Sequence, residues 1–168
     1  FGDAPEDVAE TVRRAGEIGL SGCGIEDTVM SPGNPAYDFD LAVERIKAAC
    51  AAARALSHDF VLTARADGIL TRQYDTDEAI KRLRGFAAVG ADCLYAPLPQ
   101  DMADQARICR AVEVPVNALV AGAYTQQSWQ DFADNGEARI SLGSSLARVT
   151  PRAMYDAAMQ MFEGGSFE

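Results

Sequence analysis

Helix-like and strand-like patterns alternate along the whole chain of 168 residues, and this alternation constrains the fold more than any other feature. Five short apolar runs are predicted strands, and they cover residues 22–26, 60–65, 92–97, 114–120 and 139–143. Strands that are continuously apolar are typical of a sheet that is covered on both faces. Because a helical pattern lies between each pair of successive runs, the sequence predicts an α/β fold with a parallel sheet.

Six helices are expected from the spacing of apolar residues, over residues 3–19, 38–56, 75–89, 101–112, 125–135 and 150–162. Their predicted ends depend on N-cap residues, on prolines in the first turn and on terminating glycines. These signals are Asp3 with Pro5 and Glu6, Asp75 with Glu78, Thr150 with Pro151, Gly90, and Gly136.

Two folds with a parallel sheet compete for this pattern. A doubly wound sheet usually has a glycine-rich turn after its first strand, and none follows residues 22–26. A barrel carries its functional residues at the C-terminal ends of several strands, which is where this chain has its polar residues. We therefore expect a (β/α)8 TIM barrel.

A complete barrel needs eight strands and typically about 250 residues. The chain has five predicted strands and opens on a helix. Residues 1–168 are therefore expected to form the C-terminal portion of a single barrel domain, with roughly its last five strands and their helices. Neither an internal repeat nor an interdomain linker is evident in the sequence.

The composition excludes several classes of partner. A net charge of -10 argues against nucleic acid and against an anionic membrane surface, because both require a basic face. No apolar run approaches the roughly 20 residues of a membrane-spanning helix. The cysteines form no C-x-x-C pair and lie in apolar runs, so we expect reduced core residues in a cytoplasmic protein. They are Cys23, Cys50, Cys93 and Cys109.

Glu26 ends the first predicted strand, where desolvation of a lone carboxylate is costly. A magnesium ion would offset this cost, since Mg²⁺ binds one or two carboxylates together with water and substrate oxygens. An ion pair with Arg65, at the end of the next strand, is the alternative, and the residues alone leave both open. Arg65 itself emerges from an apolar run, and its guanidinium favours binding of a substrate carboxylate or phosphate over a structural salt bridge.

Further polar residues lie in or after the later strands, and they include Tyr95, Asn117 and Ser141. The run 140–145 is similar to loops that offer backbone N–H groups to an anion, although tight packing at Gly143 explains it better. His58 is the only histidine and precedes a strand, so we expect it on the surface, away from any site.

Seven segments in register extend over nearly the whole chain, and together they resemble the phosphoenolpyruvate mutase/isocitrate lyase family. They are Phe-Gly-Asp at 1–3, Gly-Cys-Gly-Ile-Glu-Asp at 22–27, Tyr-Asp-Phe-Asp-Leu-Ala at 37–42, Leu-Thr-Ala-Arg-Ala-Asp at 62–67, Gly-Ala-Asp-Cys-Leu-Tyr at 90–95, Pro-Val-Asn at 115–117 and Arg-Ile-Ser-Leu-Gly at 139–143. The resemblance implies a barrel that uses Mg²⁺ to hold a 2-oxo acid and to stabilise its enolate.

The resemblance also implies roles for individual residues. Glu26 corresponds to an acid that reaches the metal through water, and Arg65 to an arginine that contacts substrate. Asn34 corresponds to an asparagine of a gating loop, while Asn117 and Ser141 are expected to bind substrate. The last helix is expected to be exchanged between subunits of a homodimer or homotetramer, or else to pack on its own barrel.

The sequence also departs from the family pattern. The main metal acids of the family correspond to positions before Phe1, and the lyase signature Lys-Lys-Cys-Gly-His is absent from residues 28–35. We therefore expect a Mg²⁺-dependent lyase, decarboxylase or hydrolase for a small 2-oxo acid, and not an isocitrate or methylisocitrate lyase. The alternatives are a phosphate-binding barrel aldolase or isomerase and a non-catalytic barrel module.

Overall fold

The computed structural model describes residues 2–29, 31–33 and 35–167, and within them five parallel strands alternate with helices. The strands are β1 (Gly22–Glu26), β2 (Val61–Arg65), β3 (Cys93–Tyr95), β4 (Val116–Leu119) and β5 (Arg139–Ser141). The helices are α1 (Pro5–Glu17), α2 (Phe39–Arg54), α3 (Thr76–Ala88), α4 (Met102–Ala111), the 3₁₀ helix η1 (Gly122–Gln126), α5 (Trp129–Asn135) and α6 (Ser145–Gly164). The predicted α/β fold with a parallel sheet is confirmed.

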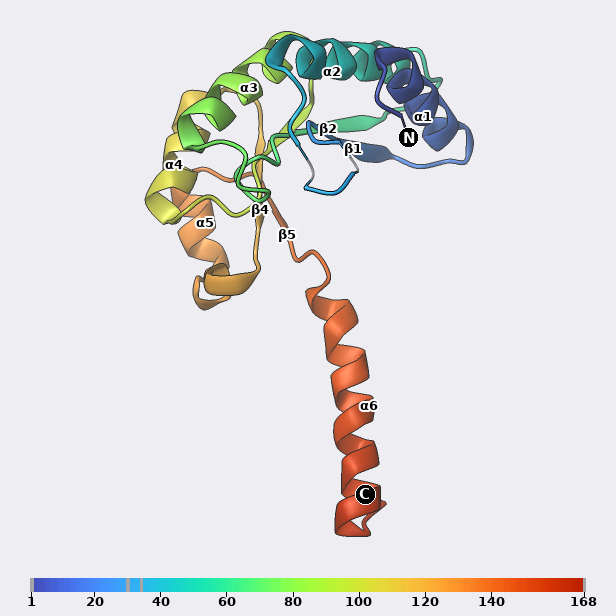
Figure 1. Cartoon of the computed structure of the whole chain (residues 1–168), viewed down its shortest axis with the longest axis vertical. Coiled ribbons are helices and arrows are strands. Elements are labelled where there is room, and N and C mark those ends of the chain that lie inside the picture. The colour runs from blue at the N-terminus through green and yellow to red at the C-terminus, as the bar shows by residue number, and fades with distance from the viewer. Residues whose placement is uncertain (1, 30, 34, 168) are drawn as a thin grey trace.

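The strands lie in the sheet in their order along the chain, β1-β2-β3-β4-β5. A doubly wound sheet reverses its strand order at a switch point, and these five strands contain no reversal. Helices α1 to α5 form an arc around the outer side of the sheet (Figure 1). We call the opposite side, which these helices leave uncovered, the inner face.

The hydrophobic core lies between the outer face of the sheet and the arc of helices. Buried strand residues, among them Leu62, Leu94 and Val116, form one cluster there with buried residues of α1 to α4, among them Ile46, Leu83 and Ile108. Because side chains alternate along a strand, this packing directs every second side chain to the inner face. A second, smaller cluster joins Ala118 to Tyr124 and Phe132.

The first helix begins differently from the prediction. Its N-cap is Ala4 and not Asp3, and the acid that accepts a hydrogen bond from the Ala4 N–H is Asp7, not Glu6. The physical reason is that Asp3 has a partner outside the helix: the Tyr37 hydroxyl donates to its carboxylate over 2.5 Å. An alanine N-cap is tolerated because Pro5 occupies the first turn, as predicted. Proline has no backbone N–H, so one donor fewer needs a partner at this end of the helix.

Other predicted helix ends agree with the structure. The Asp75 carboxylate caps α3 by accepting from the backbone N–H of Glu78 over 3.0 Å. Gly90 and Gly136 follow α3 and α5 with φ of 101° and 102°, a left-handed conformation that glycine adopts without strain. The predicted helix 125–135 is instead two elements, η1 and α5, because Ser128 between them caps α5 by accepting from the Asp131 N–H.

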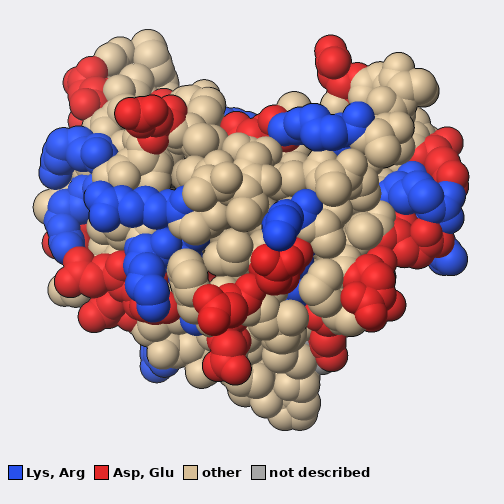
Figure 2. Space-filling view, turned by 90° about the horizontal axis from the view of Figure 1, so that it is seen from above, with Lys and Arg blue, Asp and Glu red and all other residues tan. Residues whose placement is uncertain are grey.

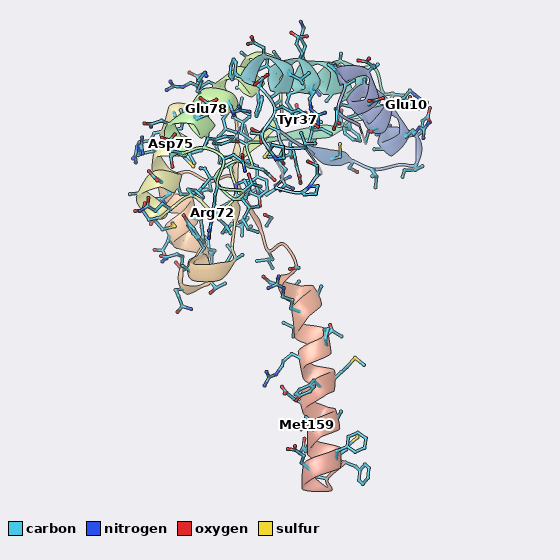
Figure 3. All side chains as sticks on the ribbon, in the orientation of Figure 1. Glu10, Tyr37, Arg72, Asp75, Glu78 and Met159 are labelled. Carbon is cyan, nitrogen blue, oxygen red and sulfur yellow. The ribbon has the colours of Figure 1, made fainter. Side chains whose placement is uncertain are left out.

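The last helix was predicted to begin at Thr150, but α6 begins at Ser145 and contains Pro151. Proline removes one backbone donor within a helix and normally destabilises it. In α6 the carbonyl that loses its partner can bind water, because none of the residues of this helix is buried. The helix projects away from the sheet, and Met159 lies far from the inner face (Figure 3).

Charged residues of both signs are interspersed over the helices on the face seen in Figure 2. Many form pairs one helical turn apart, such as Glu10 with Arg14 at 2.6 Å. All four cysteines are free thiols, and burial raises the pKa of Cys50 to about 11. No helix in the described ranges is both long enough and apolar enough to cross a bilayer.

Candidate active site on the inner face of the sheet

One register row crosses all five strands and carries mostly polar residues. Glu26 pairs with Arg65, Arg65 with Tyr95, Tyr95 with Asn117, and Asn117 with Arg139. Ile25, Ala64, Leu94 and Val116, which precede the first four of these residues, pack into the core, so the row faces the inner side. Arg139 shares that side, because its side chain contacts Asn117 and Thr63. A hollow of about 590 Å³ lies on this side and is lined by four members of the row together with Ser141, two residues beyond Arg139.

Arg65 binds two carboxylates at once. Its Nε and Nη2 donate to Asp67 over 3.0 and 2.7 Å, and its Nη1 lies 3.0 Å from the Glu26 Oε1. The guanidinium also lies over the ring of Tyr95, 5.0 Å from its centroid. The ion pair between Glu26 and Arg65, one of the two readings of the sequence, is therefore present, and it leaves a substrate role for Arg65 untested.

Asp67 is a second carboxylate partner of Arg65, and sequence analysis did not single it out as a site residue. Its side chain is 5% exposed, and burial raises its pKa to about 6 although Arg65 opposes the shift. The signal available in the sequence was its place two residues beyond Arg65. Because side chains of a strand at this spacing share one face, the two are expected to meet.

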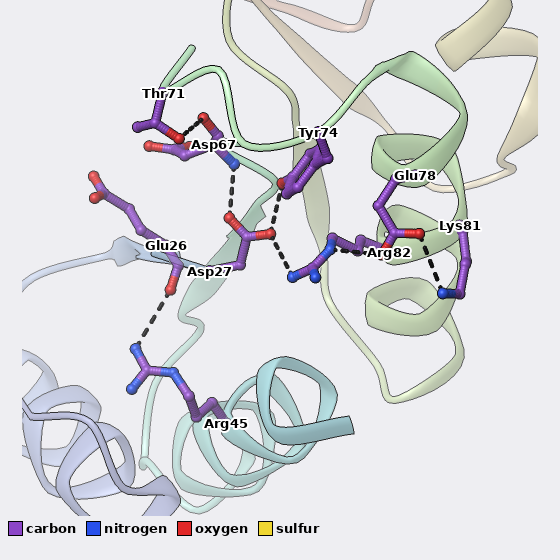
Figure 4. A network of polar contacts seen from close by, with 9 residues as sticks. All are labelled: Glu26, Asp27, Arg45, Asp67, Thr71, Tyr74, Glu78, Lys81 and Arg82. Atoms are coloured by element: carbon purple, nitrogen blue, oxygen red, sulfur yellow. Dashed lines mark hydrogen bonds and ion pairs between the residues drawn. The ribbon is translucent and has the colours of Figure 1, made fainter. Parts of the chain in front are cut away.

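Asp27 faces the opposite side of the sheet from its neighbour Glu26. Its buried carboxylate accepts from the Tyr74 hydroxyl over 2.6 Å, from Arg82 over 3.1 Å and from the backbone N–H of Asp67 over 2.8 Å (Figure 4). Desolvation raises the pKa of Tyr74, and the charge of Asp27 raises it further. Asp27 thus ties β1 to the loop after β2 and to α3, which holds that loop beside the inner face.

Asn117 and Ser141, both predicted to bind substrate, lie in contact with each other, and Arg139 joins them. The Asn117 amide donates to the Ser141 hydroxyl over 2.9 Å, and Ser141 donates to the carbonyl of Ala118 over 3.1 Å. Arg139 Nε donates to the Asn117 Oδ1 over 2.8 Å, and its Nη2 donates to the Thr63 hydroxyl over 3.2 Å. Sequence analysis missed Arg139 as a site residue, although an arginine that begins an apolar strand was a visible signal.

Four of the predicted site residues therefore share the inner face: Glu26, Arg65, Asn117 and Ser141. Asn34 lies outside the described residues. His58 is exposed between α2 and β2, with its Nε2 3.4 Å from the carbonyl of Leu20, at the opposite ends of the strands.

The described residues supply only part of a metal site. They contain no group of three or more His, Cys, Asp or Glu side chains arranged to hold a metal ion. Glu26 is the available carboxylate, since its side chain is 41% exposed and Arg65 engages it through one oxygen. It also lines a second hollow of about 510 Å³, with Asp3, Tyr37 and Arg45. A single carboxylate of this kind fits a contact to a hydrated Mg²⁺ and does not form a complete binding site.

Together the fold and the site define a class: parallel α/β proteins with polar side chains on the inner face of the sheet, several of them, such as Glu26, Arg65 and Ser141, at the carboxyl ends of strands. Within this class the model of the phosphoenolpyruvate phosphomutase family matches residues 1–162, and the chain belongs to this family. The resemblance to the phosphoenolpyruvate mutase/isocitrate lyase family is thereby confirmed.

Curated and solved relatives agree with this assignment. Oxaloacetate decarboxylase of Paraburkholderia xenovorans (strain LB400) is 33% identical over an alignment of 168 positions, which covers 95% of this chain and 53% of that protein. A crystal structure from Burkholderia cenocepacia J2315, described as a lyase/mutase, is 43% identical to this chain, with a TM-score of 0.93. The match covers 99% of this chain and 60% of that protein. The chain thus spans about half the length of the curated relatives that it matches most extensively.

A more distant structure shares the fold. Phosphonopyruvate hydrolase, solved in complex with oxalate and Mg²⁺, is 20% identical with a TM-score of 0.84, and 100% of this chain covers 59% of it.

Proposed function

We propose that the complete protein is a Mg²⁺-dependent lyase, decarboxylase or hydrolase that acts on a small 2-oxo acid through an enolate. The observation that carries the proposal is the pair Glu26 and Arg65, on adjacent strand ends at the mouth of the inner face, in a chain of this family. The relatives support it, because they include an oxaloacetate decarboxylase and a phosphonopyruvate hydrolase bound to oxalate and Mg²⁺.

Residues 1–168 are proposed to be the C-terminal portion of one (β/α)8 barrel. The support is the consecutive parallel order of the strands and the position of α1 to α5 on one side of the sheet. Within the described ranges β1 pairs only with β2, and β5 only with β4. Such open edges are unfavourable when exposed, and three further strands between them would close both.

In this proposal Glu26 contacts a hydrated Mg²⁺ through water, and carboxylates outside the described residues complete the coordination. When bound, the metal supplies a Lewis acid that stabilises the developing enolate oxygen. Arg65 orients the substrate, and Asn117 and Ser141 bind it from the later strands. Asn34 is retained as a proposed gating residue.

The protein is further proposed to form a homodimer or homotetramer through α6. The support is its apolar face, formed by Ala153, Met154, Ala157, Ala158, Met161 and Phe162, in a helix with no buried residue. The exposed part of Phe162 is 88% of the residue surface, a large apolar area to leave in water. The free thiols support a reducing compartment such as the cytoplasm.

Calorimetric titration of the full-length protein with Mg²⁺ and oxalate, a mimic of enolpyruvate, tests this function. We expect oxalate to bind only when Mg²⁺ is present, and Arg65→Ala to weaken it at least about tenfold, because a charge-assisted contact is lost. His58→Ala is the control, since this exposed residue lies at the other end of the strands. Absence of Mg²⁺ binding, or an Arg65→Ala variant that binds oxalate like the wild type, would contradict the proposal.

A further inference from the structure

Two arginines face the hollow on the inner side of the sheet, and their surroundings differ. All three nitrogens of the Arg65 guanidinium face carboxylate oxygens of Asp67 and Glu26. Among the described residues, Arg139 contacts only neutral acceptors, the Asn117 amide oxygen and the Thr63 hydroxyl. Arg139 is therefore the cation of the inner face whose charge no described carboxylate compensates.

Arg139 also reaches far across the site. It begins β5, the last strand of the row, yet its Nη2 donates to Thr63 on β2. The side chain thus crosses in front of β3 and β4, and the guanidinium lies over the middle of the inner face. Its Nη1 finds no acceptor among the described residues and remains available to a ligand in the hollow of about 590 Å³.

The neighbours of Arg139 determine what kind of group fits beside it. Because Arg139 donates to the Asn117 Oδ1, the amide of Asn117 must turn its NH₂ toward Ser141. This NH₂ donates to Ser141, and the Asn117 side chain itself is fully buried. The donor group that faces the hollow is therefore the guanidinium of Arg139, which suits an acceptor-only anion with a planar pair of oxygens, a carboxylate.

We propose that Arg139 binds the carboxylate of the substrate that is distal from the keto group, so that the site selects 2-oxo dicarboxylates over 2-oxo monocarboxylates. The inference rests on the proposed function, in which the keto end of the substrate lies at the side of Glu26 and Arg65. Arg139 enters from the opposite edge of the row. A substrate that spans the inner face meets a cation at each end.

The same carboxylate chemistry could come from the protein itself, as an acid outside the described residues that pairs with Arg139. The two sources predict different consequences of removing the charge. A ligand carboxylate makes Arg139 important only for ligands that carry it. A protein carboxylate makes Arg139 important for stability and for every ligand alike, since the acid would be left buried and unpaired.

The test measures the affinity of the full-length protein, with Mg²⁺ present, for two probes. One is 3,3-difluorooxaloacetate, the dicarboxylate inhibitor found in a structure of oxaloacetate acetylhydrolase. The other is pyruvate, which has a keto acid end but no distal carboxylate. Both are titrated into the wild type, Arg139→Gln and Arg139→Lys, with Arg148→Gln as the control at an exposed arginine of α6.

We expect Arg139→Gln to weaken binding of 3,3-difluorooxaloacetate at least about tenfold and that of pyruvate less than about twofold. Arg139→Lys should bind 3,3-difluorooxaloacetate more tightly than Arg139→Gln but less tightly than the wild type. Lysine keeps the positive charge but lacks the planar guanidinium that can bind a carboxylate through two N–H groups. If Arg139→Gln does not fold, the selective loss in Arg139→Lys answers the same question. Equal weakening of both probes, or no weakening of either, would overturn the inference. A wild type that binds neither probe would instead refute the proposed function.

Discussion

At the scale of single residues, adjacent acids at the end of β1 have separate roles. Glu26 and Asp27 follow one another, but strand alternation directs Glu26 to the inner face and Asp27 to the side of α3. Asp27 is fully covered and its carboxylate meets three donors, whereas Glu26 is partly exposed and meets one guanidinium. The first arrangement stabilises the fold, and the second leaves a carboxylate available for binding.

Loss of Arg82 should be strongly destabilising. This side chain is 7% exposed and pairs with the buried Asp27, which Arg82→Ala would leave as a buried charge with weaker compensation. We expect the free energy of unfolding, measured with urea on the full-length protein, to fall by about 3–5 kcal/mol. Lys47→Ala, which removes an exposed pair with Glu44, should cost less than about 1 kcal/mol. Equal losses in the two variants would contradict the role given to Asp27.

The Asp67 carboxyl should make stability depend on pH. Burial raises its folded pKa to about 6 from an ordinary value of 3.8, so the folded state holds this proton more tightly than the unfolded state. Its contribution to stability is therefore present below about pH 4 and is lost as the pH rises through about 6. The slope attributable to this group is at most about 1.4 kcal/mol per pH unit.

Urea unfolding of the wild type and of Asp67→Asn between pH 4.5 and 7.5 checks this dependence. The free energy of unfolding of the wild type, minus that of the variant, should decrease as the pH rises across this range. A difference that stays constant, or that increases with pH, would show that the pairing with Arg65 outweighs burial.

At the scale of elements, α2 and α3 both have aspartate as the N-cap residue, but the two side chains differ in their hydrogen bonding. Asp75 accepts a hydrogen bond from the N–H of Glu78, while Asp38, the N-cap of α2, makes no side-chain cap hydrogen bond. The cap of α3 satisfies one of the backbone donors that a helix leaves free at its start. Both aspartates lie at the positive end of a helix dipole, so they differ mainly in this hydrogen bond.

Asp75→Ala should therefore lower the free energy of unfolding by about 1 kcal/mol. Asp38→Ala is the matched control and should cost only a few tenths of a kcal/mol, the part due to the helix dipole. Thermal or urea unfolding of the two variants measures the difference. If Asp38→Ala proves as costly as Asp75→Ala, the hydrogen bond of Asp75 contributes nothing measurable.

At the scale of the whole molecule, α6 differs from the rest of the chain in how much of it is buried. The sheet and α1 to α5 enclose a common core, whereas α6 buries none of its residues and projects outward (Figure 1). Of the two predicted placements of the last helix, packing on its own barrel is not observed among the described residues. The other placement, an exchange of the helix with a second copy, stays a proposal.

Substitution on the apolar face of α6 should change the oligomeric state. Met154 lies on this face and is 69% exposed, and Met154→Glu would introduce a charge into the proposed contact between copies. Light scattering coupled to size-exclusion chromatography should show a smaller species for this variant than for the wild type. Met159→Glu makes the same chemical change five residues further on, on another side of the helix, and should leave the mass unaltered. A Met154→Glu variant with the wild-type mass would contradict assembly through α6.

The sequence by itself determined the alternation of helices and strands, the parallel sheet, the cap at Asp75 and the polar residues at the strand ends. These depend on local properties, which are apolar spacing, capping oxygens and glycine conformation. The start of α6 at Ser145 was missed, because Thr150-Pro151 is a strong local signal for a helix start that this continuous helix overrides.

Only the tertiary structure decided which polar residues meet. The register aligns Glu26, Arg65, Tyr95, Asn117 and Arg139 in one row, although 113 positions separate the first from the last. Register follows from how the outer face of each strand packs against the helices, and the spacing of residues along the chain does not contain it. For this reason the sequence identified Arg65 as the anion-binding residue, while the fold surrounds Arg65 with carboxylates and gives Arg139 none from the residues that the structure describes.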